Sequence, residues 1–479
     1  MQPLYLIAVI GTRLITVLST LTLSYLLDPP ALGRYVLVVT NALLAQMILG
    51  AWLTSIANRI LTTDGSLDRE GLSSIASALI LVLLIAIATA AFAPLLVPMN
   101  AARLASVIAL AFLLICYDTT LAIKNAAGDE RGYSRLAMIR NSTAFLLSVS
   151  FVLAGYGFVG AVAGQILGTL LALIGMSSVV EMWKVARPSM DTLRALRRHI
   201  SLGVAGAATL GIYIAVNAPS RNIMGHVTGV AGAGVWALCS DLFYGPLAVI
   251  GNAYGLSQIR LLYLAAQSED ENSIARTARD LFEFTLSIAI PYAIGGAIFG
   301  PRIVALVFPV AQAPNASLVV VPAILQGAGL LVLYSLASVG LARRRFGLIV
   351  AMVVTTAAAA MLGAWWGGEL TRAAWYSALA TCVVISIWSA WSATISIVRS
   401  RIREMAKILA ACAALTLTAI IGVSLFDFPG GWLVALGLSS VAFVVAALLS
   451  GLSGFANALP PRLRTRLTRH FPVGPSMIP

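Results

Sequence analysis

The chain has 479 residues, of which 60% are hydrophobic and only 10% are charged, and its mean hydropathy is +0.95. Soluble globular domains carry about 25% charged residues, so this composition excludes a soluble enzyme and predicts a polytopic membrane protein. The net charge of +13 does not indicate nucleic-acid binding. The basic residues lie in short loops between apolar segments, without the aromatic and motif context of a nucleic-acid site.

Apolar stretches long enough to cross a bilayer as helices follow one another along the chain. We predict an all-α polytopic membrane protein of about 14 transmembrane helices. Strand content should be close to nil, because backbone exposed to lipid must satisfy its own hydrogen bonds. The predicted spans are 5–27, 36–60, 73–97, 101–123, 135–155, 157–180, 201–225, 229–257, 279–299, 316–341, 346–367, 373–398, 406–425 and 431–451.

The lysines and arginines fall mainly on one side of these spans. Of the 31 in the chain, 24 lie in the loops after even-numbered spans, at the span ends beside those loops or in the C-terminal tail, and 5 lie on the opposite side. The remaining two, Arg13 and Arg140, lie within spans, away from the span ends. Because basic residues concentrate in cytoplasmic loops, this asymmetry predicts an even number of spans and places both termini in the cytoplasm.

The spans divide into a six-helix lobe over 1–181, a second six-helix lobe over 201–398 and two additional helices over 399–451, followed by a basic cytoplasmic tail over 452–479. Between the lobes, 182–200 predicts a short amphipathic helix on the cytoplasmic surface, with a plain basic linker as the alternative.

A faint repeat relates the two lobes. The sequence ALGRY at 31–35 matches GAGVW at 232–236, and AFAP at 91–94 matches IFGP at 298–301. Repeated halves are common in transporters, whose substrate site lies between them near the middle of the membrane.

Arg13 is the most informative residue of the first span. An arginine at the centre of a membrane helix costs roughly 2.5–3.5 kcal/mol on insertion scales. Thr16, Thr20 and Ser24 follow it at helical spacing, so one face of this helix is polar. We predict that Arg13 faces a central cavity and binds substrate; an arginine that only fixes helix packing is the alternative.

Other intramembrane polar residues extend this candidate site. Arg221, with Asn217 one turn away in the seventh span, and Arg59 in the second span complete the predicted substrate-binding set. Asp241 lies midway along the eighth span, at a depth similar to that of Arg13. We expect it to act in coupling or gating, either by pairing with Arg13 across the lobes or by carrying a proton or cation.

Asp118 and Arg140 lie at about the same depth in the fourth and fifth spans, which predicts a structural ion pair. Asn41 and Gln46 of the second span can add polar lining, although their angular separation prevents both from facing one cavity.

No catalytic or metal-binding pattern accompanies these residues. The sequence has no Ser-His-Asp set, no HExxH and no Walker A loop. The four cysteines are isolated in apolar segments and form no CxxC pair. We therefore expect no cofactor and no metal, and a transporter instead of an enzyme.

Two repeated six-helix lobes, a first helix with a central arginine and the sequence DPPALGRYVLVV at 28–39 together resemble the multidrug/oligosaccharidyl-lipid/polysaccharide (MOP) flippase superfamily. The polysaccharide transport, or Wzx-type, branch is similar in its turn between the first two helices, here Asp28-Pro29-Pro30 followed by Leu32-Gly33-Arg34-Tyr35.

The resemblance implies a flippase that moves polyprenyl-pyrophosphate-linked oligosaccharide units across the bacterial inner membrane by alternating access. It further implies a cationic cavity lined by the first, second, seventh and eighth helices, which carry Arg13, Arg59, Arg221 and Asp241. The implied partners are the lipid-linked oligosaccharide, membrane lipids and the polymerase and chain-length regulator of the same pathway. Exopolysaccharide, capsule or O-antigen units are expected ahead of lipid II.

Two alternatives stay open from the sequence. A cation-coupled multidrug exporter of the same fold would need acidic residues in the N-terminal half of the cavity, and the first two helices contain none. A membrane polysaccharide polymerase or ligase would carry a large outer loop with arginine and histidine, whereas the outer connections here are short.

Overall fold

The computed structural model describes residues 3–60, 69–96, 101–175, 189, 191, 200–247, 271–310, 312–394, 402–425 and 431–449. Within these ranges every regular element is a helix, which confirms the predicted all-α fold. The described residues hold eight helices that are long and apolar enough to cross a membrane by length and composition. The count of fourteen spans stays a prediction.

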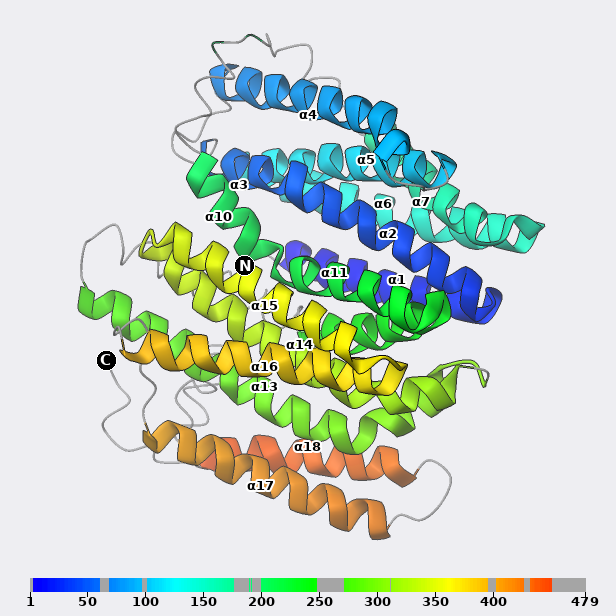
Figure 1. Ribbon diagram of the computed structural model, residues 1–479. Coiled ribbons are helices and arrows are strands. Elements are labelled where there is room, and N and C mark those ends of the chain that lie inside the picture. The colour runs from blue at the N-terminus through cyan, green and yellow to red at the C-terminus, as the bar shows by residue number, and fades with distance from the viewer. Residues whose placement is uncertain are drawn as a thin grey trace.

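The first group of helices, which we call the N-terminal half, contains α1 to α7 and a short π-helical element, η1 (Figure 1). Its bounds are α1 Pro3–Leu26, α2 Pro29–Leu49, α3 Ala51–Ile60, α4 Arg69–Leu96, α5 Ala101–Ala126, α6 Glu130–Phe151, η1 Val152–Tyr156 and α7 Gly157–Gly175.

The second group, which we call the C-terminal half, contains α10 to α16 and a helix over residues 229–247. Its labelled helices are α10 Ile200–Leu210, α11 Ile212–Val227, α13 Glu271–Val307, α14 Ala313–Ala342, α15 Phe346–Gly367 and α16 Leu370–Thr394. Two further helices, α17 Ile402–Leu425 and α18 Gly431–Leu449, pack on each other and on α13.

The turn between α1 and α2 shows why the sequence changes direction there. The Asp28 carboxylate accepts a hydrogen bond of 3.0 Å from the backbone N–H of Ala31, so it caps the N-terminus of α2. Pro29 and Pro30 occupy the first helical positions, where a missing N–H does no harm. The proline pair is therefore a helix start, and the helix that follows it, α2, packs on α5.

Two of the predicted spans are each built from two helices. The predicted span 36–60 is divided at Gly50 into α2 and α3, and the predicted span 201–225 is divided at Gly211 into α10 and α11. The broken pairs face one another, since α3 packs on α10 and α2 packs on α11. These contacts join the two halves at two levels.

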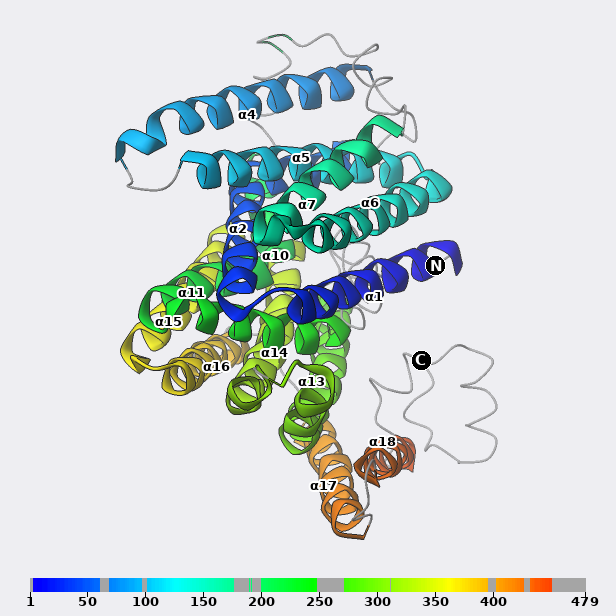
Figure 2. The ribbon, with the colours of Figure 1, turned by 90° about the vertical axis from the view of Figure 1, so that its right-hand side faces the viewer.

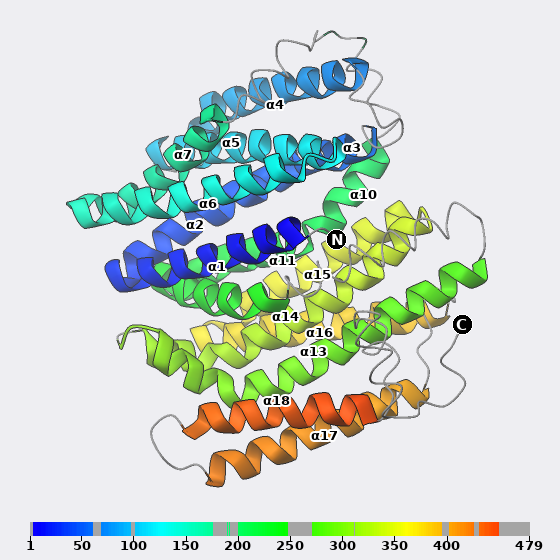
Figure 3. The ribbon, with the colours of Figure 1, turned by 180° about the vertical axis from the view of Figure 1, so that it is seen from behind.

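The helices form one bundle (Figure 1). Helices α2 to α7 gather on one side and α13 to α16 on the other, with α1, α10 and α11 between them. Figure 2 shows α17 and α18 at the far edge from α4, outside α13. Seen from behind in Figure 3, α1 runs beside α6, and the two helices are in contact. Helix α1 therefore packs on the N-terminal half at the side that faces the C-terminal half.

The amphipathic helix predicted over 182–200 and the basic tail predicted over 452–479 lie outside the described residues, apart from Ser189, Asp191 and Ile200. On the described loop between α5 and α6, Asp129 caps α6 by accepting from the N–H of Gly132 at 2.8 Å. The hydrogen bond from Lys124, together with that N–H, holds the pKa of Asp129 below its ordinary value.

Helices α6 and α7 pack with their backbones in close approach. A Cβ added at Gly168 would collide with the backbone of Ala144, and one added at Gly164 would collide with the backbone of Ser148. The Ser148 hydroxyl uses this proximity to donate a hydrogen bond of 2.9 Å to the carbonyl of Ala161. Small residues let membrane helices associate in this way.

We expect Gly168→Ala to destabilise the protein by about 1–3 kcal/mol, because α6 and α7 must separate to admit the methyl group. Thermal unfolding of the purified protein in detergent measures the effect. Gly175→Ala is the matched control at the end of the same helix, where an added Cβ meets nothing within 4 Å. Equal melting temperatures for the two variants would contradict the close packing.

Candidate functional site

A cavity of about 600 Å³ lies between the two halves. Its walls come from α1, α2, α3, α5, α6 and α7 on one side, and from α10, α11, the 229–247 helix and α14 on the other. The charged and aromatic side chains that line it are Arg13, Tyr35, Tyr117, Asp118, Arg140, Tyr213, Arg221, Asp241, Tyr244 and Tyr334. Three arginines and two aspartates give this lining a formal positive excess.

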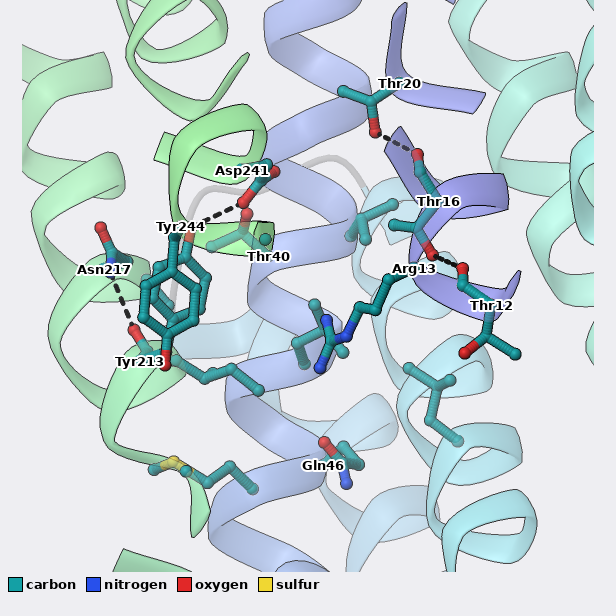
Figure 4. A pocket seen from close by; sticks show the side chains of 18 of the residues that line it. Thr12, Arg13, Thr16, Thr20, Thr40, Gln46, Tyr213, Asn217, Asp241 and Tyr244 are labelled. Carbon is teal, nitrogen blue, oxygen red and sulfur yellow. Dashed lines mark hydrogen bonds between the residues drawn. The ribbon is translucent and has the colours of Figure 1, made fainter. Parts of the chain in front are cut away.

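Arg13 points from α1 into the cavity, as Figure 4 shows. Its neighbours on the same face, Thr16 and Thr20, donate their hydroxyl hydrogens to carbonyls one turn earlier, at 2.8 and 3.0 Å. The hydroxyl hydrogens of these threonines are therefore used within α1, and neither threonine forms a hydrogen bond with Arg13. Within the described part of the chain, Arg13 makes no hydrogen bond and no ion pair.

Arg221 and Asp241 form an ion pair inside the C-terminal half. The guanidinium nitrogen Nη2 of Arg221 lies 2.5 Å from Oδ1 of Asp241, and the Tyr213 hydroxyl donates to the same oxygen at 2.7 Å. Arg221 is buried with 6% of its side chain exposed, whereas Asp241 is 34% exposed toward the cavity. The predicted pairing of Asp241 with Arg13 is wrong for this conformation, because α11 and the 229–247 helix follow one another in the chain and bring Arg221 to the carboxylate first.

Tyr213 and Tyr244 stack in the same half, with ring centroids 3.8 Å apart and ring planes 4° from parallel (Figure 4). The guanidinium of Arg221 lies 5.8 Å from the centroid of the Tyr213 ring and donates to its hydroxyl at 3.0 Å. The ion pair therefore fixes one ring, and that ring supports the other at the cavity wall.

Two polar contacts cross between the halves beside this cluster. Arg221 donates through Nη1 to the Thr40 hydroxyl on α2 at 3.2 Å. The amides of Asn41 and Asn222 exchange a pair of hydrogen bonds of 3.2 and 2.7 Å. Nearby, an added Cβ at Gly33 would collide with the carbonyl of Val230, so the backbones of α2 and the 229–247 helix are in contact there. These contacts join the two halves beside the cavity.

Asp118 and Arg140 both line the cavity, but they do not form the predicted ion pair. Asp118 accepts a hydrogen bond of 2.5 Å from the Gln46 amide of α2. Arg140 donates to Asn141 at 3.0 Å and to Thr169 at 3.3 Å, and its guanidinium lies 5.5 Å from the centroid of the Tyr117 ring. Both side chains bond to neutral groups instead, Asp118 to Gln46 of α2 and Arg140 to Thr169 of α7. The predicted ion pair, which rested on equal depth in the membrane, was therefore wrong.

The two other predicted site residues have different outcomes. Asn217 is buried in the cavity wall and donates to the backbone carbonyl of Tyr213 at 3.1 Å. Arg59 lies in α3, and its side chain lies outside the described residues.

Several lining residues were missed from the sequence, above all Tyr213 and Tyr244. A usable signal was present, because Thr209, Tyr213, Asn217 and Arg221 recur every four residues and so share one face of the α10–α11 span. The sequence analysis identified only Asn217 and Arg221 of this set.

The described residues contain no group of three or more His, Cys, Asp or Glu side chains that could hold a metal ion. The chemistry of the described site is therefore that of arginines, hydroxyls, amides and stacked phenols, which suits binding of an anionic, hydroxyl-rich molecule.

Comparison with known proteins places this site in a family. The model of a family described as polysaccharide biosynthesis protein matches residues 14–311, more than half of the chain. The chain belongs to this family of polysaccharide biosynthesis proteins. No curated protein matches the chain.

Solved structures share the fold of this polysaccharide biosynthesis protein. The lipid II flippase MurJ in an inward closed conformation has a TM-score of 0.72 at 14% identity, over 93% of this chain and 98% of MurJ. A MOP superfamily transporter from Pyrococcus furiosus gives 0.56 at 15% identity, over 82% of this chain and 94% of its own. The Vibrio cholerae MATE transporter VcmN gives 0.55 at 15% identity with the same coverage. The fold is thus that of MOP superfamily transporters.

We expect Arg221→Gln and Asp241→Asn to be coupled in a double-mutant cycle of unfolding free energy, with an interaction of about 0.5–3 kcal/mol, because each removes the partner of the other. The matched control is the cycle of Arg13→Gln with Asp241→Asn, which should be additive. Coupling in the control cycle, or additivity in the first, would contradict the pairing described above.

Proposed function

We propose that this polysaccharide biosynthesis protein is a flippase that moves polyprenyl-pyrophosphate-linked oligosaccharide units across the bacterial inner membrane. The observation that carries the proposal is Arg13, which points into an internal cavity and makes no ion pair with a described residue. An unpaired cation in a membrane protein is costly unless water or an anionic ligand meets it. The head group of a lipid-linked sugar carries such an anion.

The chemistry of the cavity matches a pyrophosphate. Arginine presents a planar fork of donors that fits phosphate oxygens, and such charge-assisted hydrogen bonds are among the strongest in proteins. Arg13 and Arg140 lie on the wall of the N-terminal half, while Arg221 is already neutralised by Asp241. We therefore assign pyrophosphate binding to Arg13 and Arg140 and a supporting role to Arg221, with Arg59 retained as a candidate.

The dimensions of the cavity suit a head group and not a whole lipid. Sites that enclose small ligands have volumes of about 300–1,000 Å³, and this cavity has about 600 Å³. We propose that the pyrophosphate and the first sugars occupy it while the polyprenyl tail stays in the bilayer. The Asn217 carbonyl oxygen and the threonine hydroxyl oxygens of the lining can accept hydrogen bonds from sugar hydroxyls.

The family description names polysaccharide biosynthesis, and we propose units of an exported polysaccharide, such as exopolysaccharide, capsule or O-antigen, ahead of lipid II. The concentration of arginine and lysine on one side supports an orientation with both termini in the cytoplasm. In this proposal the lobes 1–181 and 201–398 alternate in exposing the cavity. A polymerase and a chain-length regulator of the same pathway then receive the product.

A multidrug exporter of the same fold is the second candidate, favoured by the similarity to MATE transporters. An exported organic cation needs an available carboxylate. Asp241 is neutralised by Arg221, Asp118 accepts a hydrogen bond from Gln46 without an ion pair, and arginines outnumber carboxylates in the lining. The charge of the described cavity therefore favours an anionic substrate.

Deletion of the gene should cause complete lipid-linked repeat units to accumulate in the cytoplasmic leaflet, which can be measured by extraction after labelling from either side of the membrane. Unpolymerised single units on the outer surface would instead identify a polymerase or ligase. Normal polysaccharide with a gain in drug sensitivity would identify an exporter.

We expect Arg13→Ala to reduce polysaccharide export at least tenfold while the amount of membrane protein stays normal, because Arg13 has no described partner to lose. Arg13→Lys should restore part of the export, since it keeps the charge but loses the fork. Arg302→Ala is the control, because this exposed arginine lies outside the cavity lining. Normal export by Arg13→Ala would show that the arginine is structural.

A further inference from the structure

The two carboxylates of the cavity have different surroundings. Asp241 receives a charged donor from Arg221 and a hydroxyl donor from Tyr213, both on the same oxygen. Asp118 receives one neutral donor, the Gln46 amide. No described lysine or arginine lies within ion-pair distance of Asp118. Asp241 is therefore held ionised by a direct ion pair, whereas Asp118 has none with a described residue and is more sensitive to a charge that enters the cavity.

The wall that holds Asp118 is also the wall with available positive charge. Arg13, Asp118 and Arg140 line the cavity from α1, α5 and α6, so this wall carries one net positive charge when Asp118 is ionised. It carries two when Asp118 is neutral. On the opposite wall Arg221 and Asp241 cancel. A change at Asp118 therefore doubles the net charge that an anion meets.

We propose that Asp118 takes up one proton when an anionic head group binds at Arg13 and Arg140, so that substrate capture and proton uptake are linked. The proposal rests on the proposed function for its ligand class, a lipid-linked pyrophosphate. A bound pyrophosphate is a like charge beside the Asp118 carboxylate, and like charges at one poorly solvated site favour protonation of one of them. The proton comes from water and binds a carboxylate oxygen, and it returns to water when the head group leaves.

Gln46 suits both states of Asp118. Its amide nitrogen donates to the carboxylate in the ligand-free protein. After a turn of the amide, its carbonyl oxygen can accept from the protonated acid, because a glutamine side chain carries both kinds of group. A lysine or arginine at this place would hold Asp118 ionised throughout.

The other groups around Asp118 do not replace it in this role. The cavity-lining titratable or charged side chains on the elements that pack around α5 are Tyr35 on α2, Tyr117 on α5 and Arg140 on α6, and α1 adds Arg13. The described side chains of α3, α4 and α7 contribute no charge there, and α7 contributes the neutral Gln165. The opposite wall presents Tyr213, Arg221, Asp241, Tyr244 and Tyr334. Asp118 is thus the single unpaired carboxylate of the described lining.

Infrared difference spectroscopy on the purified full-length protein tests the proposal, with farnesyl pyrophosphate as the probe and farnesol as the uncharged control. Adding farnesyl pyrophosphate to the wild-type protein should produce the band of a protonated carboxyl group, and farnesol should not. The band should be absent in Asp118→Asn and should persist in Asp241→Asn, the matched variant on the opposite wall.

Affinities give a second measurement. Asp118→Asn fixes the neutral state of this side chain. The affinity of the variant for farnesyl pyrophosphate, divided by the affinity of the wild type, should therefore rise with pH, by up to tenfold per pH unit. Using the ratio removes the ionisation of the probe itself. A ratio that stays constant with pH would overturn the linkage.

If Asp118→Asn fails to fold, the test is the infrared difference spectrum of the wild-type protein with farnesyl pyrophosphate. Binding of farnesyl pyrophosphate without the carboxyl band would overturn the proposal and leave the proposed function intact. Absence of farnesyl pyrophosphate binding at every pH where the protein is folded would overturn both.

Discussion

The placement of charge inside a membrane is the constraint on which the rest of this structure depends. The described cavity holds three arginines and two aspartates, and only one of the possible ion pairs, Arg221 with Asp241, is formed. The other charged groups are held by neutral partners or by none. Because charges in hydrocarbon are tolerated only beside protein, water or ligand, the bundle must keep an internal space open around Arg13. The helix breaks at Gly50 and Gly211 and the capped turn at Asp28 lie in the helices that form this space.

Much of the architecture could be predicted because membrane insertion leaves few options for the backbone. Apolar length and the lysine and arginine asymmetry are properties of the sequence alone, and the all-α fold follows from them. The start of α2 at Pro29 was missed, since the predicted span began at residue 36, although an acid followed by two prolines is a usual helix start. The breaks at Gly50 and Gly211 were not visible, because glycine is common within membrane helices and marks a break only when neighbouring helices fix it there.

The partners of the polar residues were much harder to predict than the residues themselves. Depth along each helix suggested pairing Asp118 with Arg140 and Asp241 with Arg13, whereas the structure gives Gln46 and Arg221 as the carboxylates' partners. Depth fixes one coordinate only, and the rotation of each helix about its axis is set by packing. Gly168 against Ala144 and Gly33 against Val230 are examples of contacts that set such rotations. These contacts are between residues distant in the chain, so no local pattern encodes them.

The strength of the contacts differs within and between the halves. The described ion pairs, such as Arg221 with Asp241 and Arg343 with Glu271, lie within one half or its loops. The described polar side-chain contacts across the interface are hydrogen bonds with at most one charged partner, and they lie beside an apolar cluster that includes Leu32 of α2 and Trp236 of the 229–247 helix. Examples are Asn41 with Asn222 and Tyr25 with the carbonyl of Val307. A typical hydrogen bond contributes only about 0.5–1.5 kcal/mol net, and these groups can exchange it for a hydrogen bond to water when the interface opens. Separating an ion pair in a poorly solvated interior is far more costly. Ion pairs therefore stabilise each half internally, whereas the polar contacts between the halves are individually weaker and add to the apolar cluster that the halves share.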